Sequence, residues 1–260
     1  MKKILIAAAL AGLSASSAFA ADMAVKAPMY TKAVSPAYIW TGFYIGADAG
    51  GAWTHNSATW NPLPSPTAFG ANAITSNDNG AGFIGGIHAG YNYQIAPTWV
   101  VGIEGDWMWS SEKGSWTQGW FNPNTGTVSA PGSFTTMSEK LNLLSSIRGR
   151  IGYLATPNLM AYGTGGVAFA RFDDEASNSN GTAYATAASD HNTQTGFTVG
   201  GGLEYMMTAY WTVKAEYLFY RFNSGQSVTA NSTAFPTFPS NYVWHSTNIN
   251  VARAGVSYKF

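Results

Sequence analysis

The sequence predicts an all-β fold, an eight-stranded antiparallel transmembrane β-barrel with short periplasmic turns and four long extracellular loops. The composition combines 15% aromatic residues and 29 glycines with only 10% charged residues, against roughly 25% charged in ordinary soluble domains. Apolar residues recur at every second position in eight segments, as expected when alternate side chains face lipid. The connections between these segments alternate long and short, which disfavours the competing interpretation, a secreted β-sandwich.

Residues 1–20 are predicted to be a Sec signal peptide. Lys2 and Lys3 form a basic start, residues 4–13 form an apolar run too short to span a bilayer, and residues 18–20 form an A-x-A cleavage motif. We expect cleavage between Ala20 and Ala21. Residues 21–41 carry two prolines and no clear period, and are predicted to be a periplasmic N-terminal extension. Residues 42–260 then form the barrel.

The eight predicted strands are 42–53, 82–95, 99–111, 138–154, 159–172, 194–207, 211–223 and 248–260. In each, one parity is mostly apolar and is assigned to lipid, whereas the other is small or polar and is assigned to the interior. The fourth strand is assigned Leu141 and Leu143 on its lipid face. The fifth is ambiguous, because Gly and Ala occupy both of its faces, and we favour Ala161, Val167 and Phe169 as outward.

Polar stretches rich in Gly, Pro, Asn and Ser separate alternate strands, and they are predicted to be the long loops: 54–79, 112–137, 173–193 and 224–245. Short turns join the other strands at 96–98, 155–158 and 208–210. Aromatic residues at the strand ends are expected to form two interfacial girdles. Trp40, Tyr93, Trp99, Tyr153, Tyr210, Trp211 and Tyr258 are assigned to the periplasmic one, and Trp53, Trp107 and Trp109 to the outer one.

The last predicted strand places Val256, Tyr258 and Phe260 on one parity and ends on an aromatic residue. It resembles the closing strand of Gram-negative outer-membrane β-barrels, in which this pattern is an assembly signal. The segment WTGFYIG at residues 40–46 resembles the first strand of the alphaproteobacterial outer-membrane immunogenic and hemin-binding group, which is related to OmpA-like barrels. The resemblance implies an outer-membrane location, delivery by the barrel assembly machinery, and contact with outer-membrane lipid and lipopolysaccharide.

The inner-parity positions hold a near-balanced set of charges. An outward charge at the bilayer midplane costs about 2–4 kcal/mol, and an eight-stranded barrel is only wide enough for side chains to fill. We therefore expect these residues to form ion pairs that plug the bore, the alternative being the lining of a narrow pore. They are Asp48, Glu104, Asp106, Arg148, Arg150, Glu204, Lys214, Glu216 and Arg253.

The sequence contains no cysteine, which excludes disulfides and thiolate metal sites. Without Lys2 and Lys3, 13 − 2 = 11 basic residues face 13 acidic ones, and nothing indicates nucleic-acid binding. His55, His191 and His245 fall in or beside predicted loops, and His88 lies on an inner parity. Heme ligation by the loop histidines, with loop aromatics such as Trp60 and Trp244, is an alternative. Without ligand-like spacing we expect no metal or cofactor site.

Catalysis of the lipid-A-modifying or proteolytic kind needs a nucleophile beside a histidine and a carboxylate. No spacing in the sequence singles out such a set, so we expect no enzyme activity. The predicted role is an envelope-structural surface antigen whose loops meet a host or surface ligand. A small porin or a heme-binding receptor remains the alternative.

Overall fold

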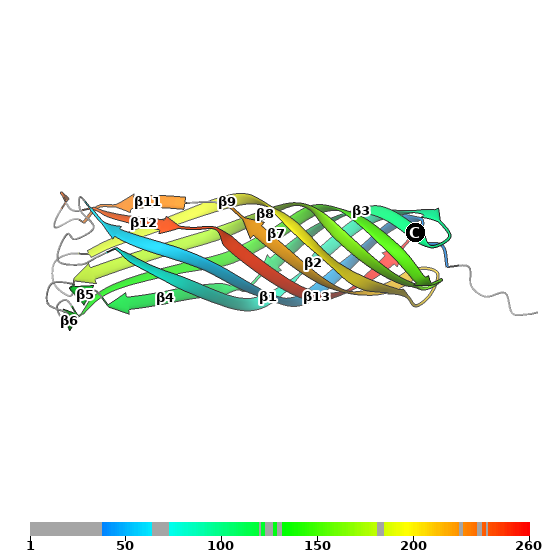
Figure 1. Cartoon of the computed structure of the whole chain (residues 1–260), viewed down its shortest axis with the longest axis horizontal. Coiled ribbons are helices and arrows are strands. Elements are labelled where there is room, and N and C mark those ends of the chain that lie inside the picture. Colours follow the sequence, from blue (N-terminus) through cyan, green and yellow to red (C-terminus); the bar gives the residue numbers. More distant parts are fainter. Residues whose placement is uncertain are drawn as a thin grey trace, which may run out of the picture. The chain divides into compact units, whose positions relative to one another are not determined.

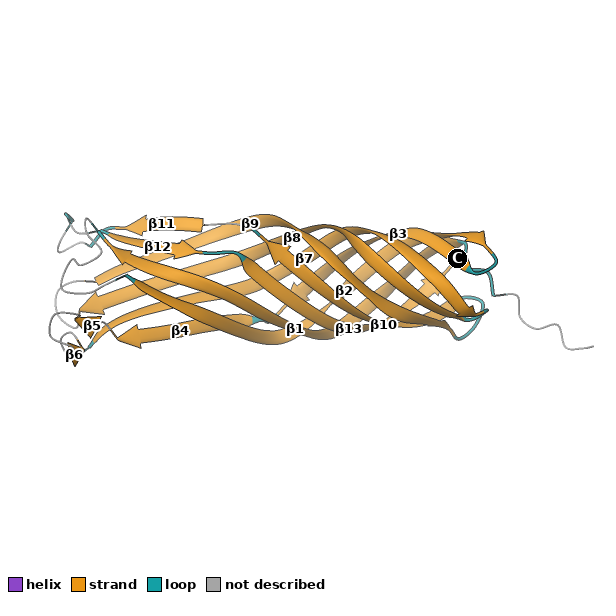
Figure 2. Cartoon of the chain, in the orientation of Figure 1, coloured by secondary structure: helices purple, strands orange, loops and turns teal. Residues whose placement is uncertain are grey.

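The computed structural model describes residues 38–63, 73–119, 121–122, 127–128, 132–180, 185–223, 226–232, 236–237 and 239–260. The predicted signal peptide, its cleavage site and most of the predicted periplasmic extension lie outside these residues. Almost all of the described chain is β-strand (Figure 1 and Figure 2). Among the described residues, no helix combines the length and the apolar character that a membrane crossing needs.

Eight long strands form a closed antiparallel ring (Figure 1). In ring order they are β1 Gly42–Pro62, β2 Ile74–Ala96, β3 Trp99–Ser110, β7 Ser133–Thr156, β8 Leu159–Asn180, β9 Ala185–Met206, β10 Trp211–Phe222 and β13 Thr247–Lys259. The last strand pairs with the first, from Tyr44↔Lys259 to His55↔Asn248. The predicted eight-stranded barrel is confirmed, and the last predicted strand, observed as β13, closes it against β1.

We call the end of the ring that carries the short turns at 96–98, 155–158 and 208–210 its lower end. The half of the ring nearest this end has an apolar outer face, which we call the belt. On β3, Ile103, Trp107 and Trp109 are about half exposed, at 56%, 48% and 57%, whereas Glu104 and Met108 between them are buried. The same alternation holds on the other ring strands, and the outward assignment of Ala161, Val167 and Phe169 on β8 is confirmed. In the belt, period 2 was a sufficient guide to which side chains face outward.

Leu141 is an exception, since it lies in the core. Leu141 and Leu144 are both fully buried although they are three residues apart. The register between β7 and β8 shifts between Leu141 and Leu143, and the extra residue, Asn142, reverses the parity as a β-bulge does. The outward prediction for Leu141 is therefore wrong, whereas Leu143 stays partly exposed.

The described residues of the four segments predicted as long loops are largely strand. β1, β2, β7, β8 and β9 continue through them, joined by β4 Lys113–Gly119, β11 Gln226–Ala230 and β12 Ser240–Trp244 and by the small pair β5 Phe121–Asn122 and β6 Thr127–Val128. The outer face here is polar, but the inner face still alternates, with buried Ala58, Trp60, Tyr242 and Trp244. The prediction of loops from the polar composition of these segments is therefore wrong for the strands that leave the belt.

Above the belt the ring continues as two four-stranded sheets, β4–β7–β8–β9 and β11–β12–β1–β2. Between β2 and β4 the described residues share a single pair, Ala81↔Lys113. Across the other seam, Gln226 of β11 hydrogen-bonds to Asp190 and Asn192 of β9. An apolar core that includes Trp60 and Tyr242 fills the space between the sheets. We call these two sheets and their core the column.

Trp40, which precedes β1, closes the lower mouth of the barrel. It is 1% exposed and packs with Val100, Met160 and Met206. Its indole nitrogen donates a hydrogen bond to the carbonyl oxygen of Pro157 at 3.0 Å. The expectation that Trp40 belongs to the interfacial girdle is wrong, because this hydrogen bond and the apolar cluster hold the ring inside the mouth.

Candidate functional site in the filled interior

The structure brings all nine predicted interior charges together in one layer of the bore. Each is less than a tenth exposed, and ion pairs link them into one connected set. Five carboxylates face four cations: Asp48, Glu104, Asp106, Glu204 and Glu216 against Arg148, Arg150, Lys214 and Arg253. A buried charge is tolerated only when paired in this way.

Arg148 lies at the centre of this layer. Its Nη2 is 2.6 Å from Glu104 Oε1 and 2.9 Å from Asp106 Oδ2, and its Nη1 is 2.9 Å from Glu216 Oε1. Period 2 puts Glu104 and Asp106 on the same face of β3, and the register sets Glu104 directly opposite Arg148. Arg148 thus joins β7 to β3 and, across the bore, to β10.

The other three cations complete the set from further strands. Lys214 Nζ is 3.0 Å from Glu104 Oε1, and Arg253 Nη2 is 2.6 Å from Glu216 Oε2. Arg150 pairs with Glu204 of β9 and lies 3.2 Å from Glu104 Oε2. Because the carboxylates are shared between cations, the layer cross-links β1, β3, β7, β9, β10 and β13.

Two tyrosines belong to this layer and were not singled out by the sequence. The Tyr44 hydroxyl donates to Glu104 at 2.9 Å and accepts a hydrogen bond from Arg150 at 3.0 Å, and the Arg150 guanidinium lies 4.6 Å from the centroid of the Tyr162 ring. A Cβ at Gly90 would overlap the Tyr44 hydroxyl. An inward tyrosine opposite an inward glycine was the sequence signal that would have found Tyr44.

His88 forms a second polar link, between Asp48 and Ser257. Its Nδ1 is 2.8 Å from Asp48 Oδ2, and its Nε2 is 2.8 Å from Ser257 Oγ. Gly46 of β1 is the ladder partner of both His88 and Ser257, and a Cβ at Gly46 would strike the imidazole. The missing side chain therefore lets β2 and β13 touch across β1, which strengthens the closure of the ring.

This order of contacts, serine to histidine to aspartate, is that of a catalytic triad. However, Ser257 and His88 are each 2% exposed and Asp48 is 4% exposed. A lipid or peptide would have to part the barrel wall to reach the Ser257 hydroxyl. The arrangement has the spacing of a triad, but its serine is buried, whereas acyl transfer requires a serine that the substrate can reach.

Apolar layers lie on both sides of the charged layer. Above it, Ile84, Met108, Phe172, Leu218 and Phe222 belong to one fully buried cluster. Below it, the cluster around Trp40 occupies the lower mouth. The described interior is thus filled at three successive levels, as expected for a ring of eight strands.

A set of carboxylates lies in the column, above the belt. Glu139, Asp174 and Asp190 are successive ladder partners on β7, β8 and β9. Asp174 is 1% exposed, and burial, followed by the negative charges of Asp190 and Asp173, raises its pKa to about 7. On the outer face, hydrogen bonds from His191 and Asn142 hold the pKa of Asp173 below its usual range.

The three histidines considered for heme lie on the outer side of the wall. His55 and His191 are exposed on β1 and β9, His191 is bonded to Asp173 at 2.7 Å, and His245 is bonded to Thr59 at 2.9 Å. No group of three His, Asp or Glu within the described residues is arranged to hold a metal ion. Trp60 and Trp244, considered as heme-stacking rings, are in the column core.

Comparison with known proteins decides the family. The sequence matches the model described as the outer membrane protein beta-barrel domain over residues 5–260. The chain belongs to this outer-membrane β-barrel family. A 31 kDa outer-membrane immunogenic protein of Brucella melitensis biotype 1 is 32% identical over 99% of this chain and 100% of the relative. A 22 kDa outer membrane protein of Rhizobium leguminosarum bv. viciae is 31% identical over 74% of this chain and 68% of the relative.

The protein is therefore an outer-membrane β-barrel, and the resemblance to the alphaproteobacterial immunogenic group is confirmed. Two solved structures are similar at 12% identity, each over 87% of this chain and 99% of the other. They are the protease OmpT from Escherichia coli, with a TM-score of 0.47, and OprG from Pseudomonas aeruginosa, with a TM-score of 0.46. These likenesses carry no functional argument. The belt is the lipid-facing surface of the barrel, and the column projects beyond it.

Proposed function

We propose that the protein is a non-enzymatic, non-conducting barrel that stabilises the outer membrane and displays surface segments on a rigid column. The observation that carries this proposal is the continuation of β1, β2, β7, β8 and β9 beyond the belt as two sheets around an apolar core. A wall that serves only to cross the membrane needs about 9–11 residues per strand, whereas β7 has 24.

The filled bore supports the non-conducting part of the proposal. The charged layer is bounded by apolar clusters above and below, so hydrated ions meet successive desolvating barriers. The burial of Ser257 and His88 supports the non-enzymatic part. Neither observation favours the porin or the heme receptor.

Assembly and display are the remaining parts. Val256 on the outer face of β13 is 40% exposed, and Phe260, which directly follows β13, is 71% exposed. The barrel assembly machinery would read them together with Tyr258 as its signal. Segments that join column strands, such as residues 64–72, would meet a host or a neighbouring cell. Outer-leaflet lipid and lipopolysaccharide would contact the belt and its upper edge.

Two measurements test the proposal. The refolded mature chain in a planar lipid bilayer should give no discrete conductance steps, and steps that persist in repeated preparations would make it a porin. A deletion strain should become more sensitive to detergent and should attach less to host cells. A chain in which a Gly–Ser linker replaces residues 64–72 should restore detergent resistance without restoring attachment. Full attachment by that chain would remove segment 64–72 from the display role.

A further inference from the structure

Apart from Lys259, which donates a hydrogen bond to the carbonyl oxygen of Thr41, every described lysine and arginine lies either in the bore or in one narrow outer collar. The outward ones are Lys113, Lys140, Arg171 and Arg221, all exposed. Arg171 and Arg221 are each the next outward residue after the last apolar one on their strands, Phe169 and Phe219. The collar thus marks the level at which hydrocarbon gives way to head groups, where basic side chains meet anionic lipid.

Three of these cations cluster on one wall. Lys113 of β4 and Lys140 of β7 are direct ladder partners, and Arg171 of β8 is the partner of Leu143, three residues from Lys140. Like charges placed opposite each other destabilise a sheet. None of the three forms an ion pair with a described carboxylate. The neighbouring outward carboxylate, Asp173, is instead bonded to His191 and Asn142.

An apolar groove of about 420 Å³ lies lower on the same wall. Its floor is made by small outward residues on adjacent strands, Ala89, Gly105 and Ser145, and its sides include Trp107 and Phe169. Along β7, Ser145 lies on the belt side of Lys140, and along β8, Phe169 lies on the belt side of Arg171. The groove therefore leads from the hydrocarbon level up to the cations.

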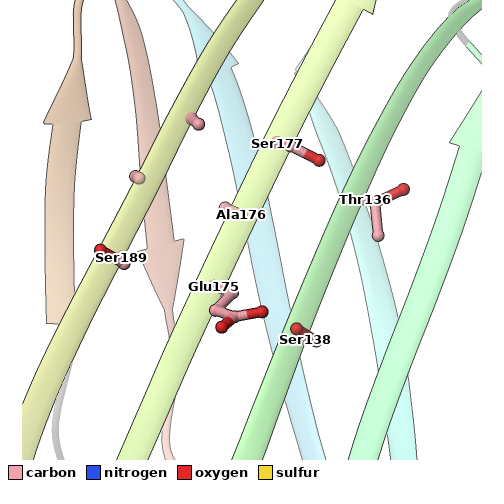
Figure 3. A pocket seen from close by; sticks show the side chains of 8 residues that line it. Thr136, Ser138, Glu175, Ala176, Ser177 and Ser189 are labelled. Atoms are coloured by element: carbon pink, nitrogen blue, oxygen red, sulfur yellow. The ribbon is translucent and has the colours of Figure 1, made fainter.

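A hydroxyl-lined depression of about 380 Å³ lies higher on this wall (Figure 3). Thr136 and Ser138 of β7 are the ladder partners of Ser177 and Glu175 of β8, and Ser189 of β9 is the next partner of Glu175. Hydroxyls and a carboxylate can exchange hydrogen bonds with sugar hydroxyls. The negative charge of Glu175 makes the depression a poor place for phosphate.

We propose that this wall binds a phosphorylated glycolipid of the outer leaflet. An acyl chain lies in the groove, a phosphate meets Lys113, Lys140 and Arg171, and sugar hydroxyls enter the depression. The order of the three surfaces identifies the occupant. Along β7 and β8 an apolar surface is followed by a cationic one and then by a hydroxyl-lined one, and in such a lipid the acyl chain, the phosphate and the sugar follow one another in the same order. The inference deepens the lipid-contact part of the proposed function and rests on it.

The test uses the refolded mature chain in dodecyl maltoside and rough lipopolysaccharide with phosphorylated lipid A, with binding measured by native mass spectrometry. A K113Q/K140Q/R171Q variant should bind roughly a hundredfold more weakly, since each basic residue near an anionic membrane surface contributes about fivefold. Arg221→Gln, which removes one cation at the same level on β10, is the control and should weaken binding by no more than about fivefold, the contribution of a single cation. Lipopolysaccharide stripped of its phosphates should bind wild type as weakly as the intact lipid binds the triple variant.

Further arms separate the sources of the signal. Inorganic phosphate in excess should not compete with lipopolysaccharide for binding, which distinguishes a lipid head group from a free anion. The Ser177→Phe variant should bind lipopolysaccharide more weakly, because the phenyl ring fills the depression. Tight binding by the triple variant, a loss in Arg221→Gln equal to the triple loss, or equal affinity for phosphatidylglycerol would each overturn the site. If wild type itself binds no lipopolysaccharide, the lipid-contact part of the proposed function fails as well, while its attachment test stands apart. All altered side chains face outward, and the shift of folded barrels on unheated gels checks that each variant is folded.

Discussion

Arg148 on β7 and Glu104 on β3 are direct ladder partners whose charged groups lie 2.6 Å apart inside the bore. The same guanidinium also serves Asp106 and Glu216. Arg148→Ala removes the cation but leaves three carboxylates in a water-poor layer, and breaking a buried pair in this way costs about 3–5 kcal/mol. We expect that loss in the free energy of unfolding, measured by urea titration of the detergent-solubilised barrel.

Arg221→Ala is the control for this prediction. Arg221 lies on the outer face of β10 and is exposed, so its loss should change the free energy of unfolding by no more than about 0.5 kcal/mol. If Arg148→Ala and Arg221→Ala unfold at the same urea concentration, the charged layer does not hold the barrel together.

The plug at the lower mouth gives a second prediction. Trp40→Ala deletes a fully buried indole, and large-to-small changes of this kind cost about 3–5 kcal/mol. The free energy of unfolding should fall accordingly, whereas conductance should stay absent because the charged layer and the apolar layer above it are intact. Trp99→Ala, on the outer face at 42% exposure, should be much milder. A channel opened by Trp40→Ala alone would show that the mouth is the only barrier.

The belt could be predicted from the sequence because lipid outside and a narrow bore inside impose opposite chemistry on alternate residues. The inward position of Leu141 could not be predicted, since a bulge is a property of the pairing between β7 and β8 rather than of β7 alone. The strands of the column were not predicted because their outer face meets water, so outward residues such as Thr136 and Ser177 give no apolar signal. The apolar residues at alternate, inward positions of the column strands, such as Ala58 and Trp60, were the remaining sequence signal for these strands.

The charged members of the candidate site were predictable, but its two tyrosines and its contacts were not. Inward parity selected all nine charges, because charge is excluded from the lipid side. The pairing of carboxylates with cations depends on the register between strands and on the curvature of the ring. The sequence of a single strand determines neither of these. The approach of His88 to Ser257 depends on Gly46, which pairs with both only after β13 has closed on β1.

The buried Ser257–His88–Asp48 set gives a third prediction. A fluorophosphonate probe labels serines that are activated by a histidine and open to solvent, and Ser257 is only 2% exposed. The folded barrel should therefore stay unlabelled under conditions that label a serine hydrolase. Ser257→Ala should cost about 1 kcal/mol of stability, as the loss of one hydrogen bond does. Labelling that Ser257→Ala abolishes would instead make the protein an enzyme.

Asp174 makes the column sensitive to pH. Its pKa is raised from the ordinary value of 3.8 to about 7 by burial and by Asp190 and Asp173, while His191 opposes the rise, and Glu139 faces it from β7. The folded state holds this proton more tightly than the unfolded chain, so stability should fall as the pH rises from about 4 to about 7 and stay low above that. Asp174→Asn keeps the shape without the charge. Thermal unfolding should then find the variant equal to wild type at low pH and more stable than wild type at pH 8. Identical slopes for the two proteins between pH 5 and pH 8 would mean that another group titrates.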